Sequence, residues 1–213
     1  SARCVSIAKC FDPNGLEANP LFLDERQRAA ERMDDPDLDQ AEHFGALRGL
    51  SRLNWASRST RIVWQPICEL SRRLEAQRLC VLDIGSGAGD VLLGLWSKAR
   101  RCRLDLELHG MDVSQRAVQY ARERSRTAGA SITYSQIDAL EQRLPEGYDV
   151  LVSSLFFHHL SESEVVSLFE KMAAATRHLL VVNDLRRCWP GLILAHAAGR
   201  LLTRSGVVHT DAP

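Results

Sequence analysis

The sequence predicts an α/β fold built on a doubly wound parallel sheet. From about residue 79, apolar runs of strand length alternate with amphipathic helical patterns, which is typical of parallel strands joined by crossover helices. A glycine-dense turn directly follows the first of these runs. The expected strands cover residues 79–84, 104–111, 131–137, 148–153 and 177–183. Ligands of such sheets bind at the carboxyl ends of the strands, so we expect a site there.

The part of the chain before the first strand shows a different pattern. Residues 1–23 are expected to be irregular, because turn signals interrupt them. Helical patterns follow, the longest from about Ser59, with Pro66 expected to kink it. We therefore expect an irregular segment and helical lid over residues 1–76, and the sheet-containing domain over residues 77–213.

Composition narrows the class of protein. The 213 residues are 45% hydrophobic, which is ample for a core, and 27 basic residues balance 27 acidic ones. This balance gives no general reason to expect nucleic acid as a partner. The six cysteines lack Cys-x-x-Cys spacing, so neither a metal site nor a secreted disulfide framework is expected. Without a leader pattern or a membrane-spanning apolar run, the chain is expected to be cytoplasmic, with at most peripheral membrane contact.

The glycine turn is the main candidate for ligand binding. Asp83 ends the first strand pattern, and the turn reads Gly85-Ser86-Gly87-Ala88-Gly89. Alternate glycines permit left-handed backbone conformations and let a ligand approach the main chain without meeting a Cβ. A helical pattern resumes at Val91, so the free N–H groups of its first turn would face the ligand. The turn suits a nucleotide-like cofactor, although taken alone it is also compatible with a simple tight connection.

Spacing distinguishes between cofactors. A dinucleotide fingerprint requires Gly-x-Gly-x-x-Gly, whereas here the third glycine comes one residue early and Asp90 follows it, which disfavours an NAD-binding oxidoreductase. Asp112 and Asp138 end the second and third expected strands. A carboxylate at Asp112 can accept hydrogen bonds from both ribose hydroxyls, or it can cap the next helix, a role for which Ser114 competes.

Five motifs together resemble class I S-adenosylmethionine (SAM) dependent methyltransferases: residues 81–90, 110–114, 137–140, 148–160 and 181–187. The sequence is most similar to bacterial enzymes of the quinone-biosynthesis type and to O-methyltransferases associated with type III polyketide synthases, which methylate alkylresorcinol-like lipids. The resemblance implies a Rossmann-like fold, SAM as cofactor, and O-methylation of a small phenolic or quinol-like acceptor in secondary metabolism. In this family the aspartate matching Asp138 accepts from the adenine amino group, and the next N–H meets a ring nitrogen. The implied cofactor contacts are Asp83, Gly85, Ser86, Gly87, Asp112, Val113, Asp138, Ala139 and Ser153.

Two adjacent histidines, His158 and His159, follow the fourth expected strand. Histidine can act as a base near neutral pH, and removal of a phenolic proton contributes roughly 10²–10⁴ in rate. We favour His159 as the catalytic base, with His158 as the second candidate. Alternatively, one histidine packs against Phe156 or Phe157 and the other hydrogen bonds to backbone.

Asn183 and Asp184 end the fifth expected strand and are candidate substrate contacts, unless they cap the helix that follows. That helix, from Gly191 to Leu202, is apolar on much of its surface. It either packs on the sheet or forms a wall for an apolar substrate or a membrane-facing patch.

One departure from the family concerns the end of the sheet. Class I methyltransferases finish with two further strands, and residues 203–213 are too few for them. We therefore expect the last two strands to be lacking, which would expose the fifth strand as an edge unless a partner chain, such as a second copy, covers it. Two functions stay open: an active O-methyltransferase, and a SAM-binding protein or truncated methyltransferase without turnover.

Overall fold

The computed structural model describes residues 4–7, 59–76 and 78–184, which belong to one compact unit. In chain order the elements are β1 (Cys4–Ile7), α2 (Ser59–Leu74), β2 (Arg78–Ile84), α3 (Asp90–Cys102), β3 (Asp105–Asp112), α4 (Gln115–Ala128), β4 (Ile132–Gln136), β5 (Tyr148–Ser154), the 3-10 helix η2 (Phe157–His159), α5 (Glu162–Ala175) and β6 (Thr176–Asn183). The five strands expected from the sequence are confirmed to within one residue at each end.

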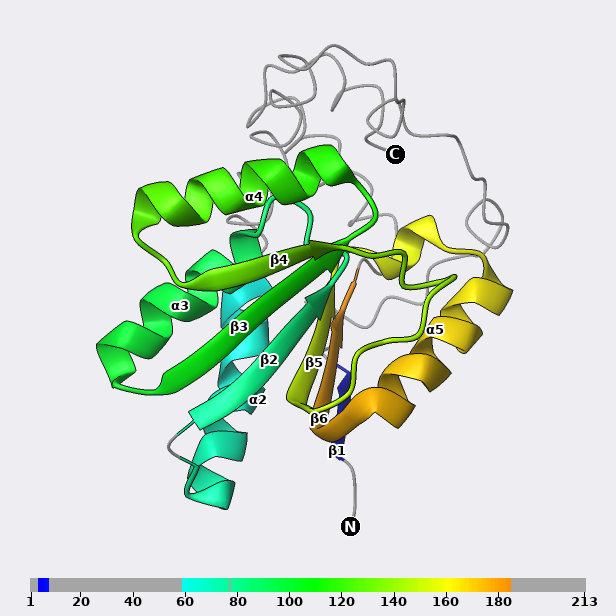
Figure 1. Ribbon diagram of the computed structural model, residues 1–213. Helices are drawn as coiled ribbons and strands as arrows, with labels where there is room; N and C mark the ends of the chain where they lie inside the picture. Colours follow the sequence, from blue (N-terminus) through cyan, green and yellow to red (C-terminus); the bar gives the residue numbers. More distant parts are fainter. Residues whose placement is uncertain (1–3, 8–58, 77, 185–213) are drawn as a thin grey trace, which may run out of the picture. The chain divides into compact units, whose positions relative to one another are not determined.

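The strands form one parallel sheet in the order β1-β6-β5-β2-β3-β4 (Figure 1). From β2 the chain moves outward through β3 to β4, and from β5 it moves the other way to β6. This reversal between β2 and β5 confirms the predicted doubly wound, Rossmann-like fold. Open sheets of this kind bind ligands beyond the carboxyl ends of the strands at the reversal, so the fold places a site at the ends of β2 and β5.

Strand β1 corrects the expectation that residues 1–23 are irregular. Cys4 pairs with Leu179 and Ile7 with Val182, so β6 is not an edge strand. Four residues are too few to show a strand periodicity, and backbone pairing with β6 stabilises this strand instead. The chain itself covers the edge for which we expected a partner, which removes the reason for expecting a second copy there. The last two strands expected to be lacking and the apolar helix from Gly191 concern residues 185–213, which lie outside the described residues.

The sheet separates two apolar cores. Strand side chains alternate between the faces: Val81 and Val150 lie in one core, and Leu82 and Leu151 in the other. Helices α2, α3 and α4 contribute buried residues to the first core, and α5 contributes to the second. Helix α2 continues through Pro66 and packs against α3 and β6, within the same unit as the sheet. The expected boundary at residues 76 and 77 therefore does not set α2 apart from the sheet.

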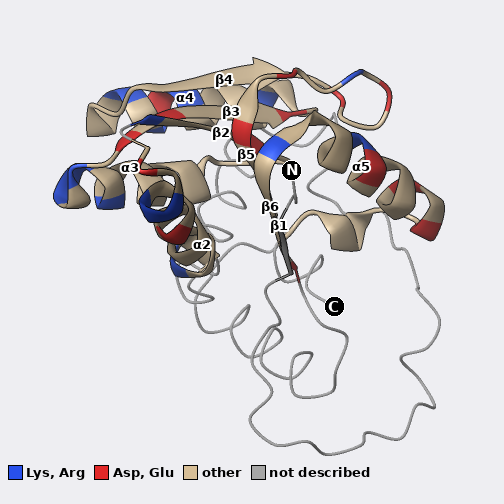
Figure 2. Ribbon diagram, turned by 90° about the horizontal axis from the view of Figure 1, so that it is seen from below, with Lys and Arg blue, Asp and Glu red and all other residues tan. Residues whose placement is uncertain are grey.

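Local sequence fixes the helix starts near the carboxyl ends of the strands. The Ser114 hydroxyl caps α4 by accepting the Ala117 N–H. Ser161 and Glu164 form a complete capping box at the start of α5, as the Ser-x-x-Glu pattern predicts. None of the described helices is long and apolar enough to cross a membrane. Basic residues predominate on α3 and α4 and acidic residues on α5 (Figure 2), so α4 can supply cations to neighbouring acidic groups.

Candidate functional site

The glycine turn leaves β2 and leads into α3. Gly85, Gly87 and Gly89 have φ values of +68°, +50° and +75°, in the left-handed region that glycine adopts without strain. A Cβ on Gly85 would lie 2.5 Å from Phe156 Cγ, so the first glycine is needed for this packing. A Cβ on Gly87 would meet no atom of the described residues within 4 Å. Gly87 therefore faces open space, in which a ligand can approach the backbone.

Asp83 lies beneath the turn and is 2% exposed. Within the described part of the chain, neither its Oδ1 atom nor Ser86 Oγ makes a hydrogen bond. Burial raises the pKa of Asp83 well above its usual range, and the charges of Asp112 and Asp90 raise it further. A buried acceptor without a donor costs folding free energy. SAM carries an ammonium group that would supply this donor, so these residues fit the expected cofactor.

Asp112, at the end of β3, holds the turn from the other side. Its Oδ2 accepts the Gly87 N–H at 2.8 Å and its Oδ1 accepts the Ser114 N–H at 2.9 Å. Ser114, not Asp112, caps α4. A carboxylate oxygen has two lone pairs, so it can accept a ribose hydroxyl in addition to a backbone N–H. The next residue, Val113, is 60% exposed, so its apolar side chain lies open next to that carboxylate.

The remaining expected cofactor residues lie after β4 and in β5. Asp138 Oδ1 accepts the Leu140 N–H at 2.8 Å, and this bond shapes the turn after β4. Ala139, which is 7% exposed, lies within that turn. Ser153 is 1% exposed, and its hydroxyl donates to the Ile84 carbonyl at 3.0 Å. Ser153 thus joins β5 to β2 beneath the turn. The structure brings the other expected cofactor residues together at the ends of β2, β3 and β4.

The two histidines end η2, directly after β5, and a carboxylate from β6 reaches one of them. His158 Nδ1 lies 2.8 Å from Asp184 Oδ1, and the His158 N–H donates to Asp184 Oδ2 at 3.1 Å. An ionised carboxylate only accepts, so Nδ1 carries the proton and the lone pair lies on Nε2. The sequence favoured His159 as the base, and the structure shows that its neighbour His158 has a carboxylate partner in Asp184. Asp184, a candidate substrate contact, fixes this ring.

Phe156 connects the histidines to the glycine turn. Its ring lies against Gly85, 6.4 Å from the ring of His159, and the two histidine rings are 4.0 Å apart. The residue before it, Leu155, has φ +56°, and its N–H donates to the Asn183 carbonyl at 2.8 Å. This left-handed residue turns the chain sharply after β5. Sequence analysis had not included Phe156 in the site, because only the fold shows its contact with Gly85.

Asn183 does not present its side chain to open space. It is 2% exposed, and its Nδ2 atom donates to the hydroxyls of Ser154 at 2.9 Å and Ser59 at 3.3 Å. Asn183 therefore joins β6 to β5 and to the start of α2, and lies within the wall of the site.

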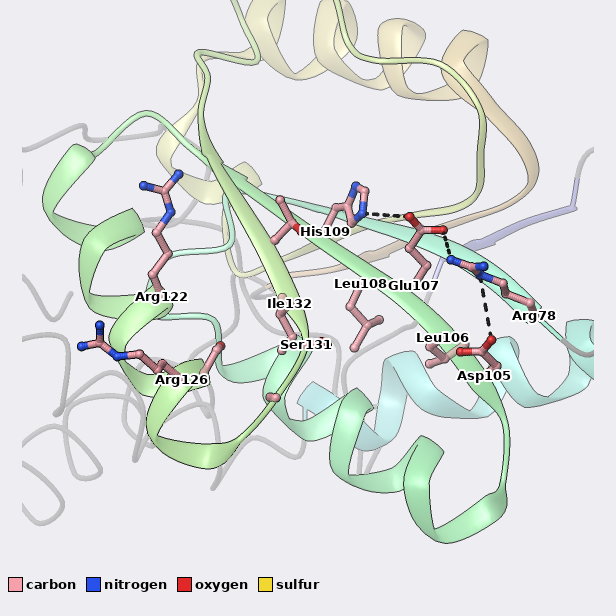
Figure 3. Close-up of a pocket in the computed structure, with 13 residues that line it drawn as sticks. Arg78, Asp105, Leu106, Glu107, Leu108, His109, Arg122, Arg126, Ser131 and Ile132 are labelled. Atoms are coloured by element: carbon pink, nitrogen blue, oxygen red, sulfur yellow. Dashed lines mark hydrogen bonds and ion pairs between the residues drawn. The ribbon is translucent and has the colours of Figure 1, made fainter.

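An open groove of about 600 Å³ lies elsewhere, along the amino-terminal half of β3 and the start of β4 (Figure 3). Several of its ionisable side chains pair with one another: Glu107 Oε2 lies 2.8 Å from Arg78 Nη2, and Glu107 Oε1 lies 3.4 Å from His109 Nε2. The groove shares no residue with the cluster at the strand ends. We therefore assign the candidate active site to the strand ends, where the unsatisfied buried acceptors lie.

One family model matches the part of the chain that contains the ends of β2, β3, β4 and β5 and most of the residues that line the groove. A family model described as a methyltransferase domain matches residues 81–178, just under half of the chain. The matched range contains the glycine turn, Asp112, Asp138 and His158. A search of curated proteins found no match.

Solved structures with a similar fold include several methyltransferases. Magnesium protoporphyrin IX methyltransferase (ChlM) from Synechocystis PCC 6803, solved with bound SAH, is 18% identical over 70% of this chain and 68% of its own, with a TM-score of 0.48. TehB from Haemophilus influenzae is 21% identical over 53% of this chain and 36% of its own (TM-score 0.43). The mitomycin 7-O-methyltransferase MmcR is 22% identical over 55% of this chain and 35% of its own (TM-score 0.46). The matched part of this chain thus spans little more than a third of the last two proteins.

Proposed function

We propose that the chain, whose residues 81–178 match a methyltransferase-domain model, is an active SAM-dependent enzyme that methylates an oxygen atom of a small acceptor. The His158–Asp184 pair beside the glycine turn carries this proposal. In this pair Asp184 fixes the proton of His158 on Nδ1, so Nε2 can act as a base. The pair lies where the order of the strands reverses, near the residues that fit SAM.

The cofactor side follows from the acceptors described above. Asp83 Oδ1 would accept from the ammonium group of SAM, and Asp112 from its ribose hydroxyls. Asp138 would accept from the adenine amino group, with Val113 against the ring. When bound, SAM supplies a methyl group on a sulfonium, already activated for in-line displacement by a nucleophile.

The acceptor side centres on His158. The lone pair on His158 Nε2 would take the proton of an acceptor hydroxyl as its oxygen becomes the nucleophile for the methyl group that SAM would supply. The Asp184 carboxylate then faces the imidazolium and stabilises it. A hydroxyl acceptor benefits most from such a base, because a phenol remains protonated near neutral pH. This argument favours O-methylation over methylation of an acceptor that is already nucleophilic.

The substrate class rests on sequence resemblance and on one aromatic side chain. Phe156 stands between the glycine turn and the histidines, where its ring would pack against an aromatic acceptor. We therefore propose a phenolic or quinol-like acceptor of the alkylresorcinol type, within secondary metabolism in the cytoplasm. Asn183 would contribute to the acceptor side as part of the wall of the site, and Asp184 would contribute by holding His158.

Two measurements test the proposal. Calorimetry with SAH tests the cofactor site, and transfer of a radioactive methyl group to a panel of phenols, quinols, alkylresorcinols and amines tests turnover. We expect a His158→Gln variant to bind SAH like the wild type and to lose roughly 10²–10⁴ in turnover. His178→Gln is the matched control, since His178 lies 3.9 Å from a carboxylate of Asp149 at the start of β5. Binding of SAH without transfer to any compound would support the alternative, a SAM-binding protein without turnover.

A further inference from the structure

A cation on α4 reaches the cofactor turn. Arg124 Nη1 donates to the Ala88 carbonyl and to Asp90 Oδ1, both at 2.7 Å. The side chains of Arg124 and Asp90 are 29% and 14% exposed, so the ion pair is partly buried. The guanidinium also lies over the Tyr120 ring, 5.7 Å from its centroid. Arg124 is therefore fixed on its own helix and joins that helix to the turn.

The turn has a particular need for such contacts. Three left-handed glycines leave it conformationally permissive, and ordering it on ligand binding would cost entropy. On the β3 side it is held by the Ser86 N–H, which donates to the Met111 carbonyl at 3.0 Å, and by the Gly87 N–H on Asp112. These two bonds hold the start and middle of the turn, but not its last residues, which lead into α3. Arg124 holds that end, at Ala88 and Asp90.

Charge gives Arg124 a second, competing explanation. Asp83, Asp90 and Asp112 surround the turn, and the latter two raise the pKa of Asp83. Loss of Arg124 would make this region more acidic, which by itself would favour SAM, whose sulfonium is cationic, over SAH, whose thioether is neutral. A purely electrostatic role and a positioning role therefore predict opposite changes in SAM affinity.

We propose that Arg124 is a positioning residue that holds the glycine turn in its SAM-binding conformation before the cofactor arrives. This inference rests on the proposed SAM site and adds a residue outside the family motifs to it. Arg124 does not touch the cofactor in this scheme; it acts through Ala88 and Asp90. The expected consequence is a loss of affinity for SAM and SAH alike.

Calorimetry on the full chain gives the deciding measurement. We expect Arg124→Ala to weaken binding of both SAM and SAH by about 10- to 100-fold, with kcat at saturating SAM changed less than about 3-fold. Arg124→Lys keeps the charge and the donors but lacks the planar guanidinium and is shorter, so it should recover part of the loss. Arg126→Ala is the matched control. This arginine lies on the same helix, its side chain is 81% exposed, and its ion pair with Glu123 is long, at 3.9 Å. The Arg126→Ala variant should bind both ligands like the wild type.

Three outcomes separate this inference from the proposed function. If the wild-type chain fails to bind SAH, the SAM site itself is wrong. If the wild type binds SAH and the folded Arg124→Ala variant binds it equally well, only the positioning role of Arg124 is overturned. The positioning role is also overturned if Arg124→Ala binds SAM, but not SAH, more tightly than the wild type. Urea unfolding checks that Arg124→Ala is folded. Should it not fold, Arg124→Lys and Asp90→Asn decide: both must weaken SAH binding in a folded chain, and wild-type affinity in either one overturns the inference.

Discussion

Replacement of Asp184 by Asn tests the proposed base with little change in shape. The amide has the size of the carboxylate but lacks the charge that faces the imidazolium formed when His158 takes the proton. With charge centres about 4 Å apart and an effective dielectric constant of about 20–40, the attraction is about 2–4 kcal/mol. The two side chains are 31% and 16% exposed, so solvent screening reduces this to about 2 kcal/mol. That value corresponds to a kcat about 30-fold lower.

The assay is the initial rate of radioactive methyl transfer at saturating SAM and acceptor, with SAH affinity measured in parallel. We expect Asp184→Asn to lower kcat and to leave the dissociation constant of SAH within about 2-fold of the wild type, because Asp184 binds no expected cofactor residue. Asp149→Asn is the control: it also removes a carboxylate near a histidine, at the opposite end of the sheet. A kcat within about 3-fold of the wild type, or a matching loss of SAH affinity, would refute the base assignment.

Three further predictions concern the turn and a helix start. Because the folded pKa of Asp83 is raised, its stabilising contribution is present below the unfolded pKa of about 3.9 and is lost as the pH rises through the folded value. Asp83→Asn should therefore stabilise the ligand-free chain at pH 7 by roughly 1–3 kcal/mol in urea unfolding while weakening SAM binding; an unchanged midpoint would contradict this. Gly87→Ala should cost only about 1 kcal/mol of stability yet abolish SAH binding in calorimetry, whereas Gly85→Ala, whose Cβ would collide with a neighbouring ring, should unfold at clearly lower urea. Ser161→Ala should lose about 1 kcal/mol of stability with unchanged SAH affinity, and a change in affinity would count against a purely capping role.

The cofactor half of the site could be predicted from sequence because its signals are local. The glycine turn and Asp112 each follow a strand whose apolar pattern is itself readable, and parallel strands bring their carboxyl ends to one edge. Strand β1 could not be predicted in this way, because its stability comes from pairing with β6, some 170 residues further along the chain.

The catalytic half depends on tertiary contacts. His158 and Asp184 are 26 residues apart in sequence and meet only because β5 and β6 are neighbours in the sheet. That Asp184 reaches His158 depends on the conformation of η2, and no residue pattern encodes that contact. Similarly, nothing in the sequence around α4 marks Arg124 among the other arginines of that helix as the one that reaches the turn.

The contact between Phe156 and Gly85 has a consequence for any attempt to alter acceptor preference. The ring belongs to the loop that carries the histidines, yet it rests on the backbone of the loop that would hold SAM. A smaller or larger residue at position 156, chosen to admit a different acceptor, would also loosen or displace the first glycine of the cofactor turn. Acceptor range and cofactor affinity are therefore expected to change together at this position, and a library that varies it should be screened for both.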